Sequence, residues 1–230
     1  GIDEMLYRLY SPILFRALAV ANAHVRRNAA NIFVDAFPIH TPNLSKPELE
    51  KAFSQQCEWV LKLLRDDAVE VRLVAVQGAC RLLSMFWAIF PITFIRDVIH
   101  RLMRELAFDS TSTGIRVTVL EGLKYVLSNH ESHMMMKVVL PSLYPLFHDV
   151  SERVRLAMVD LLHAVSHIHS IRFFDIVPLD DLLNRLPRES DIMKSQICRL
   201  LKNSYFPMEA EQEPDSTKEN VADVMSAGAN

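Results

Sequence analysis

Apolar residues recur at helical spacing along most of the chain, and the same pattern returns every 39 to 46 residues. Each return begins with an apolar residue followed by a base, and the residues 4, 8 and 11 positions later lie on the same face of a helix. The pairs are Val25-Arg26, Val71-Arg72, Ile115-Arg116, Val154-Arg155 and Met193-Lys194. Among the positions tested in this way, Ser204 alone is polar. This regularity predicts five amphipathic helices that repeat one structural unit.

A second apolar-periodic segment precedes each of these helices, and a short polar stretch separates the two. The preceding segments span about 5–19, 47–64, 91–108, 132–148 and 171–186. Such short connections indicate antiparallel helices, and no stretch shows the alternation typical of a strand. Pro12, Pro141 and Pro145 lie inside the first helices, which they should bend or tighten. The sequence therefore predicts an all-α solenoid of about five helix pairs over residues 1–206. Its repeats are expected at about 1–40, 41–90, 91–130, 131–170 and 171–206.

Two glycines occupy the same position of their repeats. Gly78 and Gly122 each lie seven residues after the apolar residue that opens the pattern. Glycine inside a helix costs about 1 kcal/mol relative to alanine. Because it returns at one repeat position, we expect both glycines to allow neighbouring helices to approach closely.

The last 24 residues, 207–230, differ in composition from the rest of the chain. They contain no aromatic residue and hold six acids against the single base Lys218, which is a net charge of −5. Since the whole chain carries −3, removing this segment leaves residues 1–206 at +2. A segment with so little apolar surface and so much charge cannot offset the entropy cost of folding, so a disordered acidic tail is predicted.

Composition also excludes several classes of protein. Half of the residues are apolar, which provides for a substantial core, whereas 5 glycines are few for a nucleotide-binding α/β fold or a β sandwich. Cys57, Cys80 and Cys198 lie far apart, which fits a reducing intracellular compartment without a disulfide framework. Charged residues interrupt every apolar run well before the roughly 18 residues of a membrane span. The first residue is Gly1 rather than methionine, and we expect a segment of a larger protein.

No motif points to catalysis. The glycines never cluster into a phosphate-binding loop, HExxH is absent, and no serine lies in a nucleophile elbow. His163 and His167 have the spacing of two zinc ligands on a helix, but no third ligand follows at a usual distance. Met134-Met135-Met136 could form an adaptable contact surface, although packing between helices is the preferred interpretation. We therefore expect no enzyme, cofactor, metal or small-molecule substrate.

The turns between paired helices resemble those of the HEAT repeat. Asp66 precedes Arg72 by six residues and Asp149 precedes Arg155 by six, while Asp109 precedes its arginine by seven. A cation near a helix N-terminus opposes the helix dipole and needs an anionic partner. The resemblance implies that an aspartate of a neighbouring repeat supplies it, forming a ladder along the stack. Asp66, Arg72, Asp149 and Arg155 are thus predicted to be structural.

Four segments show a more specific resemblance, to the G-type HEAT-repeat subunit of the condensin II complex. They are LYRLYSPILFRAL at 6–18, VRRNAA and FVDAFPI within 25–39, ELAFD at 105–109 and SERVRLAMVD at 151–160. The resemblance implies a non-catalytic subunit acting in mitotic chromosome condensation, located in the nucleus on the chromosome. It also implies binding to the kleisin subunit, through it to the SMC ATPase pair, and a contribution to holding double-stranded DNA.

Bases gather where the second helices begin, and the resemblance places these helices on the concave face of the solenoid. A row of cations there could follow a phosphate backbone without reading bases. The candidates for this contact are Arg26, Arg27, Arg116, Arg153 and Lys194. A dedicated DNA-binding protein would usually be more basic than +2. The alternative is therefore a HEAT-repeat scaffold of another kind, of the transport-receptor or phosphatase type, without DNA contact.

Overall fold

A computed structural model describes residues 5, 9, 13–40 and 44–205 of the chain, and in this part of the chain every regular element is a helix. The first helix of the chain is described over residues 13–17. The α-helices that follow are α2 (Ala23–Ala36), α3 (Lys46–Leu63), α4 (Val69–Phe86), α5 (Ile92–Arg104), α6 (Thr113–Ser128), α7 (His133–Val139), α8 (Glu152–Ser166), α9 (Leu179–Arg185) and α10 (Asp191–Tyr205). Single turns or short runs of 3-10 helix lie between them as η1 (Leu106–Phe108), η2 (His130–Ser132), η3 (Leu140–His148), η4 (Phe173–Asp175) and η5 (Leu186–Arg188). The predicted acidic tail, 207–230, and Pro12 lie outside the described residues.

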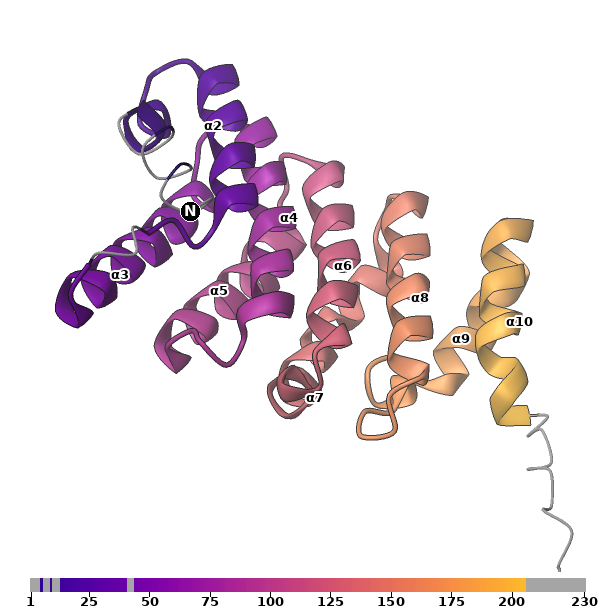
Figure 1. Cartoon of the computed structure of the whole chain (residues 1–230). Helices are drawn as coiled ribbons and strands as arrows, with labels where there is room; N and C mark the ends of the chain where they lie inside the picture. Colours follow the sequence, from indigo (N-terminus) through magenta and orange to yellow (C-terminus); the bar gives the residue numbers. More distant parts are fainter. Residues whose placement is uncertain (1–4, 6–8, 10–12, 41–43, 206–230) are drawn as a thin grey trace, which may run out of the picture.

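The long helices α2, α4, α6, α8 and α10 stand side by side in one row, and each contacts the next (Figure 1). We refer to them as the row helices. The elements α3, α5, α7 and α9 form a second layer behind them, which we term the first-helix layer (Figure 1). The predicted all-α solenoid of helix pairs is thereby confirmed.

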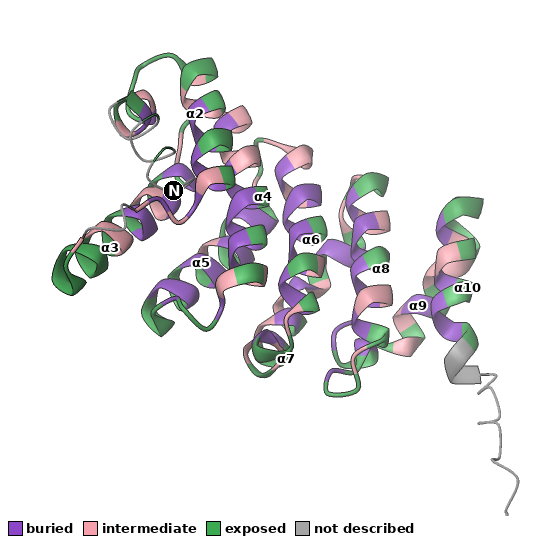
Figure 2. Ribbon diagram, viewed as in Figure 1, coloured by how far each residue is buried: buried purple, intermediate pink, exposed green. Residues whose placement is uncertain are grey.

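The predicted apolar stripe of each row helix faces the interior (Figure 2). In α6 and α8 every position of the stripe is completely buried, from Ile115 and Val154 onward. The predicted burial of the stripe is wrong for Val25, which is 42% exposed. Val25 lies in the first turn of α2, whose row neighbour among the described residues is α4, and the packing there leaves this residue partly uncovered.

Both repeated glycines lie where two row helices touch, as predicted. A Cβ atom on Gly122 of α6 would lie 2.6 Å from Sγ and 3.0 Å from Cβ of Cys80 in α4. A Cβ on Gly78 of α4 would overlap the Val34 side chain of α2. Glycine at these positions therefore sets the spacing of three consecutive row helices.

The first-helix layer is less regular than the sequence pattern predicts. The segment 132–148 is divided into the short helix α7 and the 3-10 run η3, which begins beside Pro141 and contains Pro145. The predicted tightening by these prolines is confirmed. The expectation of one helix over 171–186 is wrong, because α9 begins only after its N-cap residue, Pro178. Proline lacks the N–H group that a helix interior needs, so it marks these boundaries.

Candidate functional site

A ladder of ion pairs joins consecutive repeats where the row helices begin. Arg26 of α2 donates to Asp66 through Nε at 2.7 Å and Nη2 at 2.8 Å. Arg116 of α6 donates to Asp149 at 2.9 and 3.1 Å in the same two-pronged way. Each arginine thus reaches forward to the acid that precedes the next row helix. Paired guanidinium–carboxylate contacts of this kind are strong and fix both side chains.

The same guanidinium groups also hold the turn before their own helix. Nη1 of Arg155 donates to the carbonyl oxygens of Asp149 at 2.9 Å and Val150 at 3.3 Å. Nη1 of Arg116 donates to the Asp109 carbonyl oxygen at 2.8 Å. The Asp-to-Arg spacing therefore places the arginine against its own turn, while the aspartate side chain receives the arginine of the preceding repeat.

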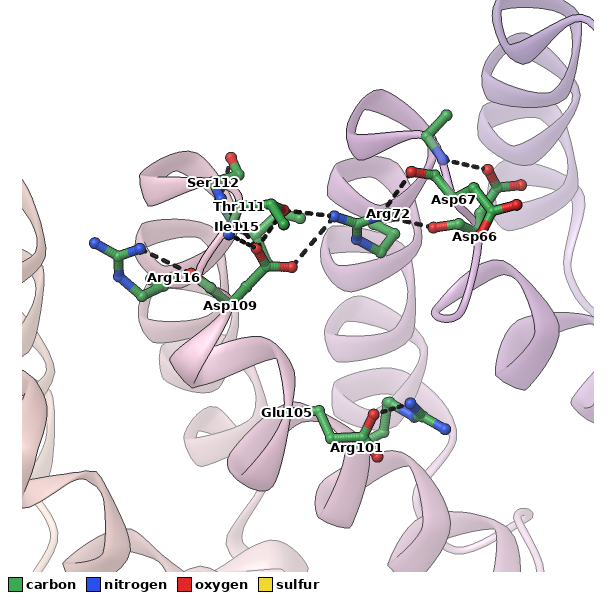
Figure 3. A network of polar contacts seen from close by, with 11 residues as sticks. Asp66, Asp67, Arg72, Arg101, Glu105, Asp109, Thr111, Ser112, Ile115 and Arg116 are labelled. Carbon is green, nitrogen blue, oxygen red and sulfur yellow. Dashed lines mark hydrogen bonds and ion pairs between the residues drawn. The ribbon is translucent and has the colours of Figure 1, made fainter.

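The rung made by Arg72 departs from this pattern (Figure 3). Its Nη1 contacts two turn carbonyls, but its Nη2 divides its hydrogen bonds between Asp109 Oδ2 at 3.2 Å and Thr111 Oγ1 at 3.0 Å. The Nε atom is buried and has no hydrogen-bond partner among the described residues. The turn that carries Asp109 is one residue longer than its counterparts, which shifts the carboxylate, and the Thr111 hydroxyl takes part of its place.

The last rung uses an acid that the sequence motif does not include. Arg155 donates to Glu189 at 3.0 and 2.8 Å, and Arg185 contacts the same carboxylate. The motif requires an aspartate six residues before a base, whereas Glu189 lies five residues before Lys194. A motif that accepted either aspartate or glutamate just before the last row helix would have found Glu189 in the sequence.

Three of the ladder carboxylates, Asp66, Asp109 and Glu189, have lowered pKa values, which favours their charged form. Burial alone would raise the pKa of Asp66, but hydrogen bonds from Arg26 and from the Ala68 N–H outweigh it and lower that pKa. Hydrogen bonds also outweigh burial at Asp109 and Glu189 and lower their pKa values. The ladder side chains from Arg26 to Glu189 are between 3% and 16% exposed.

The five candidates for DNA contact fall into two groups. Arg26 and Arg116 are occupied by the ladder. Arg27 is 42% exposed and lies 3.8 Å from Glu70, and Lys194 is 40% exposed and lies 3.3 Å from Asp191 of its own helix. Arg153 is exposed, and no carboxylate of a described residue lies at ion-pair distance from it.

A further group of bases lines a groove of about 430 Å³ between α8 and α10. Arg199 and Lys202 come from α10, His163 comes from α8, and His167 is the residue that directly follows α8. The sequence pattern did not single out the two α10 bases, although they lie three residues apart on the helix face opposite the buried Met193. His163 Nε2 lies 3.0 Å from the Gln196 carbonyl oxygen. Across the described residues, no three His, Cys, Asp or Glu side chains gather as a metal site would require.

Within the described part of the chain, no helix combines the length and the apolar character needed to cross a bilayer. Trp87 is buried, and Trp59 is half-buried with the Lys62 ammonium 4.5 Å from its ring centre. Both tryptophans therefore contribute to packing.

Residues 1–41 match the family model described as the condensin II non structural maintenance of chromosomes subunit. The chain is 38% identical to the condensin-2 complex subunit G2 of Homo sapiens over 213 residues, which are 93% of this chain and 19% of that protein. It is 39% identical to the subunit G2 of Danio rerio over 208 residues, which are 90% of this chain and 18% of that protein. Over most of its length the chain is thus similar to condensin II G2 subunits. It spans about a fifth of the length of these relatives.

Two solved structures share the fold. Computationally designed armadillo repeat proteins for modular peptide recognition superpose with a TM-score of 0.53 at 16% identity, over 87% of this chain and 90% of theirs. An engineered protein superposes with a TM-score of 0.50 at 17% identity, over 87% of each chain. At these identities the likeness concerns the fold alone.

Proposed function

We propose that this chain is part of a non-catalytic scaffold subunit of condensin II that acts in mitotic chromosome condensation, in the nucleus on the chromosome. The main support for this proposal is that the chain is 37–39% identical to G2 subunits over most of its own length. On this proposal the chain binds an extended segment of the kleisin subunit and is connected through it to the SMC ATPase pair. A stack of helix pairs suits that role, because it offers one long continuous surface.

Co-expression with the condensin II kleisin, followed by size-exclusion chromatography, tests the scaffold proposal. We expect the two proteins to elute together at a volume earlier than either alone. The condensin I kleisin is the matched control, and it should elute separately. Separate elution of the condensin II kleisin would remove the support for this partner.

We further propose weak, sequence-independent DNA contact through the exposed bases of the row helices. Arg153 and Arg27 are the main candidates, and Lys194 with the groove bases Arg199 and Lys202 extends the same row. The ladder residues Arg26 and Arg116 are not proposed as DNA contacts, because contact with phosphate would break their two-pronged pairs with the half-buried Asp66 and Asp149. The driving force would be release of counterions from the phosphates.

Binding of duplex DNA at several salt concentrations tests this contact. If two to four phosphates are neutralised, log affinity should fall with log salt at a slope of about −2 to −4. Arg27→Glu with Arg153→Glu should weaken binding equally for all sequences without a change in thermal stability. Arg96→Glu with Arg104→Glu, in the first-helix layer, changes the net charge equally and is the matched control. A double mutant that binds as wild type at low salt would show that Arg27 and Arg153 are not the contact.

The second candidate is a protein-binding scaffold without DNA contact, and the charges of the row helices favour it. Asp35 pairs with Arg81 at 2.9 Å, Glu70 lies beside Arg27, and Glu121 is exposed on the same face. These acids offset much of the positive charge that a phosphate backbone would meet. Absence of any salt-dependent DNA binding by the chain–kleisin complex would favour this function.

A further inference from the structure

A groove of about 580 Å³ lies between α5 and α7 in the first-helix layer, away from the ladder. Its floor is apolar. Ile99 and Met103 of α5 are buried, and Met135 and Val139 of α7 are half-buried beside them. The groove therefore offers apolar contact area inside a surface depression of the size that ligands occupy, about 300–1,000 Å³.

The α7 wall of the groove exposes large apolar side chains. Met134 is 77% exposed and Val138 is 78% exposed, and they lie four residues apart on one face of the helix. Each would gain by transfer out of water, since burial of apolar area is favourable. Of the three consecutive methionines, Met136 alone is fully buried. The packing interpretation holds for that residue, whereas Met134 faces solvent.

The α5 wall is basic. Arg96, His100 and Arg104 are exposed and follow one another at intervals of four residues, so they form a single stripe along the groove. No carboxylate of a described residue lies at ion-pair distance from Arg96 or Arg104, whereas Arg101 on the same helix pairs with Glu105. Among the described residues, no acidic side chain lines the groove. The α5 wall of the groove is therefore positively charged, and no negative charge of a described residue faces it.

We propose that this groove binds an amphipathic helix of a partner protein, with an apolar stripe and an acidic stripe beside it. The apolar stripe packs between the groove floor and Met134 and Val138, and the acidic stripe faces Arg96 and Arg104. In helix-in-groove recognition the bound helix inserts apolar anchors that are three or four residues apart in its sequence. Methionine side chains of the groove adapt to the shape of such anchors. Duplex DNA would satisfy the bases but would leave the methionine wall without an apolar partner. The inference goes beyond the proposed function, which assigns no contact to this layer, and does not depend on it.

Fluorescence anisotropy with a synthetic probe tests the groove on the whole 230-residue chain. The probe is a labelled helical peptide of about sixteen residues, with leucines at helical spacing and glutamates along one flank. Arg96→Glu with Arg104→Glu should weaken binding about tenfold or more, because it reverses the charge that faces the glutamates. Val138→Ser should weaken binding severalfold, because it removes an apolar wall. These side chains are exposed, so both variants should unfold thermally as wild type does.

Three controls test whether the groove itself holds the probe. Arg153→Glu with Arg199→Glu makes the same change of net charge on the row helices and should leave probe binding within about twofold. A peptide of the same composition with its leucines dispersed should bind at least tenfold more weakly. Equal loss in the charge control, or equal binding of the dispersed peptide, would overturn the groove as the site. Tighter probe binding after deletion of residues 207–230 would overturn the partner protein as occupant, because the chain's own acidic segment would then be the competitor.

Discussion

The row helices and the first-helix layer come from the same repeats but differ in regularity. The row contains α-helices of 14, 18, 16, 15 and 15 residues from α2 to α10. In the first-helix layer, α3 has 18 residues and α5 has 13, but α7 and α9 have 7 each. The row carries the glycine contacts and the ladder, both of which need a fixed register. The first-helix layer carries prolines and an exposed groove.

This difference indicates that the repeat is specified mainly through its second helix. A row helix must match its two neighbours in spacing and rotation, so substitutions there disturb two interfaces at once. An element of the first-helix layer has more freedom, as the replacement of α-helix by the 3-10 run η3 shows. Substitutions in the two layers should therefore differ in their effect on stability, from the largest loss in the row to the smallest in the first-helix layer.

Gly122→Leu should have the largest effect, a loss of about 3 kcal/mol of stability or failure to fold. Even a Cβ atom there would lie 2.6 Å from Cys80 Sγ, so α4 and α6 would have to separate. Urea unfolding followed by circular dichroism measures the change. Gly114→Ala is the control, because its Cβ would meet Ser112 Oγ at an ordinary 3.4 Å. That variant should be neutral or gain up to about 1 kcal/mol.

Arg155→Ala should cost about 1–3 kcal/mol, because it leaves Glu189, 3% exposed, without its two-pronged partner. Arg72→Ala should fall in the same range, since it releases two turn carbonyls and Asp109. Arg172→Ala is the surface control, because Arg172 pairs with Asp175 and their side chains are 66% and 39% exposed. This variant should change stability by less than about 0.5 kcal/mol. No shift for both ladder variants in denaturant unfolding would contradict the structural role of the ladder.

Stability should fall in acid. The folded-state pKa values of Asp66, Asp109 and Glu189 are lowered, so their contribution is present above the unfolded pKa values of about 3.9 for Asp and 4.3 for Glu. It is lost as the pH falls through the folded values, because the unfolded state then binds more protons. Thermal unfolding between about pH 6 and pH 2.5 measures this loss. Asp66→Asn should be less stable than wild type near pH 6 and should lose less stability as the pH falls. An unchanged slope of stability against pH would contradict the role assigned to Asp66.

Pro145→Ala, in the first-helix layer, should have the smallest effect, a loss of less than about 1 kcal/mol. The residue is exposed within η3, and its replacement mainly increases the conformational freedom of the unfolded chain. Urea unfolding measures the change. A loss as large as that of Gly122→Leu would show that the first-helix layer carries the register after all.

The sequence by itself determined the repeat, because burial of one helix face leaves a periodic record. Residue spacing predicted the buried stripes that begin at Val71, Ile115 and Val154. It also predicted the role of the two glycines, and the prolines themselves predicted the tightening at Pro141 and Pro145. Apolar spacing alone does not mark where a helix begins, so the late start of α9, after Pro178, was missed.

Only the tertiary structure decided which charges are paired. Arg26 and Arg153 look alike in the sequence, yet one is held by Asp66 forty residues away and the other faces solvent. Glu189 replaces an aspartate of the motif, and Arg96 meets the Met134 wall, because packing brings together residues from different repeats. Helical periodicity records which face of a helix is buried, whereas pairing across repeats depends on the distance and rotation between helices. Those quantities are set by close packing along the whole stack.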